Sequence, residues 1–484
     1  MSATLSPLRQ IKKTFKETVL FGNKPSAELF AILSVYFVQG ILGLARLAVS
    51  FFLKDDLGLT PAQMGALTGI AAIPWVIKPL FGFISDGLPI LGYRRRPYLV
   101  ISGLLGSLSW ILLATVVTNA WLASLTLLLT SISVAISDVI VDSLVVERAR
   151  KESLGQAGSL QSLTWGMSAF GGLITAYLSG WLLEQFSNQT VFEITAIFPF
   201  IVCIAAWFIT EEPISQDELV SHQEQSLIKQ QIKQVWQAIK QKSILLPTIF
   251  VFLWQATPHA DSAFFYFTTN QLGFAPEFLG RVRLVTSIAS LLGVFLYQKF
   301  LKNVSFRNIL GWSVVISAAL GMTMLLLVTH TNRMLGIDDH WFSLGDSLIL
   351  TVAGQIAFLP ILVLSARLCP KGIEATLFAL LMSIVNLAGL LSHELGALIT
   401  HWLGVTETNF DNLWLLVIIT NLSTLLPLPL VKWLPNSDPQ CQEKEEDKNL
   451  KYMGEAYEHH ALGTVPDEGM MPEVLPEFVT NNNK

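Results

Sequence analysis

Charged residues are scarce in this chain: they make up 14% of its 484 residues, whereas 52% are hydrophobic. An ordinary soluble domain carries roughly 25% charged residues. A water-soluble fold cannot hide so much apolar surface, which excludes the common soluble classes of enzyme and binding domain. The apolar composition indicates instead an integral membrane protein.

Cysteines and sequence motifs for cofactor chemistry are equally sparse. The three cysteines, Cys203, Cys369 and Cys441, are too few and too scattered for a disulfide framework or a cysteine-based metal site. No Gly-x-x-x-x-Gly-Lys loop cradles a phosphate, which argues against direct pumping by ATP. The first 28 residues lack the short apolar core of a secretory signal, so the first apolar span is expected to target the chain. We predict no cofactor, no metal and no nucleic-acid partner.

The apolar residues come in runs of about 20, the length that crosses a hydrocarbon core of roughly 30 Å. We predict an all-α integral membrane protein with twelve transmembrane helices, near residues 30–52, 61–84, 98–117, 121–146, 157–183, 191–210, 245–270, 277–298, 306–329, 343–366, 373–402 and 412–434.

Lysine and arginine are concentrated in the loops on one side of these spans. The loops on the same side as the N-terminus hold nearly all of them, and the other loops offer little beyond Lys54 and Arg333. Cytoplasmic loops carry such an excess of basic residues. Both termini are therefore predicted to be cytoplasmic, which agrees with an even number of spans.

The chain divides into two halves. We predict a cytoplasmic N-terminal segment (1–29), a six-helix half (30–211), a polar cytoplasmic linker (212–243), a second six-helix half (244–435) and a disordered acidic tail (436–484). The sequence Leu-Gly-Leu-Thr-Pro at 57–61 recurs as Leu-Gly-Phe-Ala-Pro at 272–276, an offset of 215 residues. Both copies lie in the turn from the first to the second helix of a half, which favours duplication and pseudo-symmetric halves.

The cytoplasmic loop between spans two and three carries a second signal. Gly82 is followed by Asp86, then by Gly92 and the basic run Arg94, Arg95 and Arg96. An arginine cluster can bind a carboxylate across a helix end, so we interpret this loop, with Glu147 and Arg148 at the end of span four, as a conformational gate. The alternative is that these charges only set the topology.

Span four contains two acids, Asp138 and Asp142, one helical turn apart on one face. An ionised acid in hydrocarbon costs roughly 2.5 to 3.5 kcal/mol, so the pair should face a cavity. Together with Pro74-Trp75, Lys78-Pro79 and Ser85-Asp86, this stretch resembles the folate-biopterin transporter family of the major facilitator superfamily. The resemblance covers the chain up to Pro435. The basic loop also resembles the loop of the major facilitator superfamily between spans two and three, except that residues 87–91 stretch its spacing.

That resemblance implies the major facilitator fold and a secondary transporter of folates or related pterins, without enzymatic activity. It also implies alternating access, protons as the coupling ion and a bacterial or plastid membrane. Another organic anion remains an alternative substrate. We expect the chain to act as a monomer.

In this architecture spans one, four, seven and ten line the cavity. The candidate substrate-binding residues there are Arg46, Asp138, Asp142, Asp261, Asp346 and Gln355. Position 46 plus the 215-residue offset gives 261, so Arg46 and Asp261 are expected to face each other at equivalent depths. A substrate clamp and a permanent structural salt bridge both remain open for this pair.

Other polar and aromatic residues are interpreted more simply, as structural residues. The aromatic run from Phe264 to Phe267 could stack a pterin but is more typical of packing. Arg281 and Arg283 are expected to snorkel or pair with acids near the outer end of span eight. The segment Ser343 to Asp346 loosely resembles the Gly-x-Gly-Asp motif of intramembrane aspartyl proteases. It lacks the first glycine and a Tyr-Asp partner, which argues against that class.

Overall fold

The computed structural model describes residues 25–150, 154–213, 233, 236–301, 304–368 and 374–435. The predicted N-terminal segment and linker lie largely outside these residues, and the predicted tail lies wholly outside them. Cys369 and Cys441 are also outside the described residues.

The N-terminal half begins with span one, which is divided into α2 (Ala27–Ile41), α3 (Leu44–Phe51) and the π-helical turn η2 (Phe52–Asp56). Span two is also divided, into α4 (Pro61–Val76) and α5 (Lys78–Gly87). Pro74 and Pro79 flank this break, and a proline within a helix removes a backbone donor. The remaining spans of this half are α6 (Arg96–Thr115), α7 (Ala120–Arg150), α8 (Leu154–Gln185) and α9 (Asn188–Ala206).

The C-terminal half begins with α12 (Lys242–Gln255), α13 (Asp261–Tyr266) and the π-helical turn η3 (Phe267–Gln271). Its other elements are α14 (Pro276–Leu296), η4 (Tyr297–Leu301), α15 (Phe306–Gly321), α16 (Met324–Val328), α17 (Thr331–Met334), α18 (Asp339–Arg367), α19 (Glu374–Trp402), α20 (Leu413–Ser423) and η5 (Leu428–Trp433).

Eleven helical stretches of the described chain are long and apolar enough to cross a membrane, and α12 is a shorter apolar helix in the place of the seventh span. The prediction of one continuous helix over 245–270 was wrong, because the helix stops between Gln255 and Asp261. Pro258 has no N–H to continue it, and the next amide, that of His259, donates to Ser392 O on α19 at 3.3 Å.

Spans one and seven repeat each other in detail. The π-helical turns η2 and η3 are 215 positions apart, and each is followed by a glycine with positive φ, Gly58 at 62° and Gly273 at 70°. The matching amides of Leu59 and Phe274 donate to Leu53 O and Thr268 O, at 3.0 and 2.9 Å. The internal repeat inferred from the sequence is therefore a repeat of backbone conformation in these turns.

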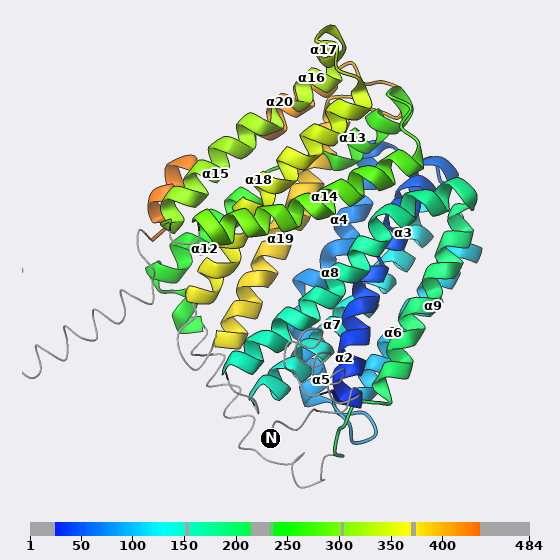
Figure 1. The fold of residues 1–484 in the computed structure, drawn as a ribbon, viewed down its shortest axis with the longest axis vertical. Helices are drawn as coiled ribbons and strands as arrows, with labels where there is room; N and C mark the ends of the chain where they lie inside the picture. Colours follow the sequence, from blue (N-terminus) through cyan, green and yellow to red (C-terminus); the bar gives the residue numbers. More distant parts are fainter. Residues whose placement is uncertain are drawn as a thin grey trace, which may run out of the picture.

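The two halves lie side by side, each with its own apolar core (Figure 1). They touch chiefly where α4 meets α19 and where α8 meets α14. At the second contact a Cβ on Gly180 would lie 2.3 Å from Pro276 O, and Gly280 packs directly against Gly180. Small residues let helix backbones approach this closely inside a membrane.

Candidate functional site

A cavity of about 1620 Å³ lies between the two halves. Seven charged side chains line it: the cations Arg46, Lys78 and Arg283, and the acids Asp138, Asp142, Asp261 and Asp346. Five of these were predicted from the sequence. Gln355 was predicted as well but is absent from the lining, because it accepts a hydrogen bond from Ser290 at 3.1 Å between α18 and α14.

The N-terminal half contributes an ion cluster centred on Lys78. Its ammonium group contacts Asp138 and lies 3.0 Å from Asp142 Oδ2, and the Tyr36 hydroxyl donates to Asp142 Oδ1 at 2.5 Å. Because Asp138 and Asp142 are one turn apart on α7, a single cation reaches both. Lys78 was missed as a site residue, although a lysine beside a proline in the middle of an apolar span is a signal for one.

The cluster does not balance its charge, since two carboxylates face one ammonium group. An excess charge inside a bilayer is costly, and the cost disappears if one carboxyl is protonated. Asp142 accepts from both Lys78 and Tyr36 and its side chain is 45% exposed, whereas the Asp138 side chain is 13% exposed. Burial disfavours the charged form of an acid and donated hydrogen bonds favour it. Asp138 is thus the more buried of the two carboxyls, and it too contacts the Lys78 ammonium group.

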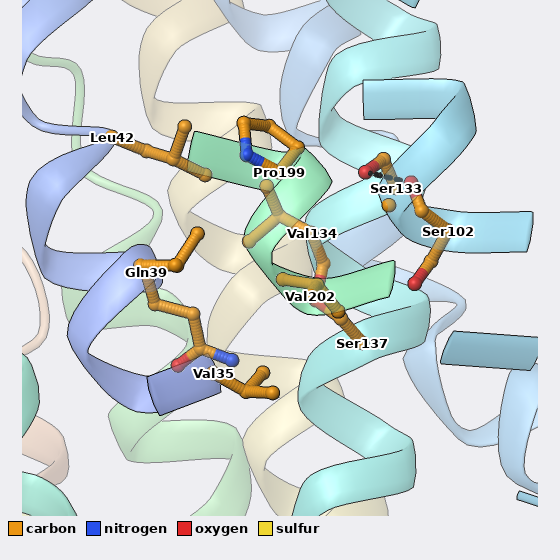
Figure 2. Close-up of a pocket in the computed structure, with 11 residues that line it drawn as sticks. Val35, Gln39, Leu42, Ser102, Ser133, Val134, Ser137, Pro199 and Val202 are labelled. Atoms are coloured by element: carbon orange, nitrogen blue, oxygen red, sulfur yellow. Dashed lines mark hydrogen bonds between the residues drawn. The ribbon is translucent and has the colours of Figure 1, made fainter. Parts of the chain in front are cut away.

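Behind this cluster a small void of about 10 Å³ is enclosed by α2, α6, α7 and α9 (Figure 2). Gln39 lines both the void and the large cavity, and its buried Nε2 has no hydrogen-bond partner among the described residues. Ser133 on the far side donates to Ser102 O at 2.6 Å. A void of this size has room for about one water molecule.

Arg46 and Asp261 both line the cavity, as the repeat predicted, and both are exposed to it. Within the described residues no ion pair joins them, so the permanent salt bridge considered from the sequence is absent from this conformation. Asp261 is the first residue of α13, after the break in span seven. Its position is therefore set by a hinge, whereas Arg46 follows a break in span one that remains nearly helical.

Arg283 also faces the cavity, which corrects the expectation for span eight. Its Nη1 donates across the two halves to Gly43 O and Ser179 Oγ, each at 3.4 Å. Arg281, two residues earlier, does pair with an acid as expected, since its Nη2 lies 2.6 Å from Glu277 Oε1.

Asp346 of the C-terminal half has no ion-pair partner among the described residues. It lies on α18 and accepts a hydrogen bond from the Thr323 hydroxyl. Of the aromatic run, Phe264 and Phe265 line the cavity, while Tyr266 and Phe267 are buried. The Tyr266 hydroxyl donates to Leu59 O in the other half, which makes it a packing residue.

The predicted gate residues gather within the N-terminal half. Arg95 lies 2.7 Å from Asp86 Oδ1 and 2.9 Å from Glu147 Oε1, so it links α5 to α7. The backbone amides of residues 94–96 donate to Glu211, which sequence reasoning did not identify, at 2.6 to 3.0 Å. Arg148 donates to Ser26 Oγ at 2.9 Å.

Hydrogen bonds between the halves are concentrated toward one end of the molecule. Lys54 donates to Asn270 Oδ1 at 2.9 Å, Tyr177 donates to Glu277 Oε1 at 3.2 Å, and the contacts of Tyr266 and Arg283 lie in the same region. Deeper in the membrane, Asn386 donates to Trp75 O at 3.0 Å. No described hydrogen bond joins the gate cluster of Asp86 and Arg95 to the C-terminal half. The cavity is thus closed at the end where the first two spans of each half connect.

Two helical halves around a charged central cavity are the architecture of the major facilitator fold. The solved structure of the nucleoside transporter NupG matches with a TM-score of 0.63 and 14% identity, over 84% of this chain and 98% of that one. A D-xylose-proton symporter matches with a TM-score of 0.61 and 15% identity, over 85% and 99%. At such identities these likenesses concern the fold.

The chain belongs to the BT1 family, whose model matches residues 39–453. It is 63% identical to a protein of Synechocystis named folate-biopterin transporter, over 96% of this chain and 95% of the relative. It is 33% identical to folate transporter 2 of Plasmodium falciparum, over 87% and 91%. These comparisons confirm the family resemblance and assign the chain to transporters, as opposed to membrane proteases.

Proposed function

We propose that this protein is a secondary transporter that carries folates and related pterins through the cavity between its halves. The names of its relatives in Synechocystis, Plasmodium falciparum and Arabidopsis thaliana support the substrate. The volume of about 1620 Å³ exceeds the roughly 300 to 1,000 Å³ of pockets for drug-sized ligands. That space accommodates a bulky conjugate together with water.

The observation that carries the proposal is the set of seven charged side chains around this closed-ended cavity. Cations and acids within one cavity suit a substrate with a carboxylate at one end and hydrogen-bond donors at the other. A folate has this character, because its glutamate carries carboxylates and its pterin ring carries donors. Arginine binds carboxylates through paired hydrogen bonds, and aspartate accepts from ring donors.

Protons are the proposed coupling ion. The cluster of Lys78, Asp138 and Asp142 is neutral when one carboxyl is protonated, and Asp138 is the less exposed of the two. Release of that proton toward one side would leave an unbalanced charge, which favours a different arrangement of α2, α5 and α7. Differential stability of two arrangements is what couples an ion to a conformational change.

Alternating access is the proposed mechanism. The halves are held together near Gly180 and Gly280, and the gate cluster forms no described bond to the opposite half. With both termini in the cytoplasm, as the basic loops predict, this is a conformation closed to the outside. The Asp86, Arg95 and Glu147 cluster would hold the helices that close the inner end in the other conformation, and the cavity within a single chain supports a monomeric unit.

Uptake by cells that express the chain tests this function. Radiolabelled folate should accumulate above its external concentration, and a proton uncoupler should abolish the accumulation. A pterin, a folate and a sugar should be compared at equal amounts of protein in the membrane. If the protein is present in the membrane but takes up neither folate nor pterin, the proposed substrate class is refuted.

A further inference from the structure

We propose that Arg46 and Arg283 together form a subsite for two carboxylates, which makes the cavity selective for pterins that carry a glutamate tail over free pterins. This inference rests on the proposed function and assigns the part of the substrate that each end of the cavity recognises.

The two arginines come from opposite halves and meet at one place. Arg46 is the third residue of α3, and Arg283 on α14 donates to the carbonyl of Gly43, the residue immediately before α3. Both side chains line the cavity. Arg283 therefore reaches the backbone of span one within one helical turn of Arg46, near the closed end of the cavity.

Neither guanidinium forms an ion pair with a described carboxylate. Other cations of this region differ: Lys78 contacts two aspartates, Lys54 lies 2.5 Å from Asp55, and Arg281 pairs with Glu277. Arginine stays protonated at all relevant pH values, so the pair cannot relieve its repulsion by losing a proton. The arrangement therefore carries two positive charges whose protein counter-ions are missing in this conformation.

A ligand with two carboxylates supplies both counter-ions at once. Each planar guanidinium offers a fork of donors that matches one carboxylate. The α- and γ-carboxylates of a terminal glutamate are close together on a short chain, so a single ligand can offer one carboxylate to each arginine. A free pterin has no carboxylate, so it gains nothing from this subsite and keeps only the contacts of its ring.

A carboxylate bound at Arg283 would also change the hydrogen bonds that close this end of the cavity. Arg283 reaches Gly43 O and Ser179 Oγ at 3.4 Å, which is long for hydrogen bonds of a charged donor. A carboxylate competes well with a neutral carbonyl and a hydroxyl for the same donors. The tail of the substrate would therefore replace a bond between the halves while it neutralises Arg46.

Displacement of labelled folate from the purified protein tests the inference. The competitors are 4-aminobenzoylglutamate, which has the two carboxylates without the pterin, and inorganic phosphate, which is a dianion without either. 4-Aminobenzoylglutamate should displace labelled folate from the wild-type protein, and phosphate at the same concentration should not. Equal competition by phosphate would overturn the assignment to a dicarboxylate.

Two variants, Arg46→Gln and Arg283→Gln, sharpen the test, with Arg281→Gln as the matched control on the same helix. Each should weaken binding of folate and of 4-aminobenzoylglutamate by about tenfold or more, the effect of one charge-assisted hydrogen bond. Binding of labelled biopterin should change by less than about twofold, since a change of that size is only about 0.4 kcal/mol. Arg283→Lys, which keeps the charge without the fork, should retain intermediate affinity.

Equal losses of folate and biopterin affinity in both glutamine variants would overturn the subsite and make the arginines structural. Unchanged folate affinity in both variants would overturn it as well. A wild-type protein that binds neither folate nor biopterin would instead refute the proposed function, so the two failures are distinguishable.

Discussion

Spans one and seven share a backbone pattern, but the charged residues that they present to the cavity are opposite in sign. Each has a break followed by a short helix, and in each a π-helical turn and a glycine with positive φ follow at positions 215 residues apart. Yet the equivalent cavity residues are Arg46 and Asp261. The comparison teaches that the repeat preserves the mechanical features of the two spans, while the side chains that face the cavity have diverged to give it two chemically different walls.

The same contrast extends to the neighbouring helices. The N-terminal half encloses Lys78 between two acids, whereas Asp261 and Asp346 in the C-terminal half have no described cation. A cluster that already contains its own counter-ion is suited to hold a proton. Acids without a counter-ion are suited to accept hydrogen bonds from a substrate. The predictions below test this division of roles.

The largest effect is expected at Arg46 and Asp261. Arg46→Ala and Asp261→Ala should each abolish folate uptake without lowering the amount of protein in the membrane, because a charged hydrogen bond at each end of the substrate is lost. The exchange of charges in Arg46→Asp with Asp261→Arg should remain inactive, since the substrate would meet the wrong charge. Recovery of uptake by this double variant would mean that the two residues form a structural bridge in another conformation.

A loss confined to uphill transport is expected in the acid cluster. Asp138→Asn fixes the neutral state of the proposed proton site, so accumulation should fall by about tenfold or more while exchange of labelled for unlabelled folate persists. Accumulation and exchange are measured in the same proteoliposomes. Equal loss of both activities would make Asp138 a substrate ligand or a structural residue.

A smaller effect is expected at the contact between the halves. A Cβ on Gly180 would lie 2.3 Å from Pro276 O, so Gly180→Ala should weaken the closed end and change the rate of folate exchange by about two- to tenfold. The control is Gly389→Ala, because a Cβ there meets no atom within 4 Å. Identical rates for the two variants would show that this contact does not limit the conformational change.

The smallest effect is expected at the gate. Asp86→Asn removes one of the two acids that bind Arg95, and it should change turnover by a few-fold with little change in folate affinity. Asp411→Asn, in an exposed loop, is the control. Weakened equilibrium binding with unchanged turnover would remove Asp86 from the gate.

The sequence was sufficient to predict most of the spans, the repeat and all four acids that line the cavity, because each depends on local pattern or spacing. Apolar length predicts a span, and the 215-residue offset relates Arg46 to Asp261 without any coordinates. The partners of these residues were harder to predict. Lys78, the first residue of α5 after the break in span two, reaches Asp138 and Asp142 across 60 and 64 positions.

The interpretation of Arg283 failed for a related reason. Arg281 and Arg283 look alike in the sequence, but two positions on a helix differ by about 200° in direction. One therefore pairs with Glu277 at the surface and the other enters the cavity. The break in span seven was also missed, since Pro258 inside an apolar run is compatible with either a kink or an interruption.

Proton movement driven by folate is the most direct test of the account. Cells that express the protein, in lightly buffered medium, should make that medium more alkaline when folate is added, because each folate would enter with a proton. Asp138→Asn should lose this alkalinisation while it still exchanges labelled folate. If cells that express the wild-type protein accumulate folate without any change in external pH, that result would contradict the coupling assigned to Lys78, Asp138 and Asp142.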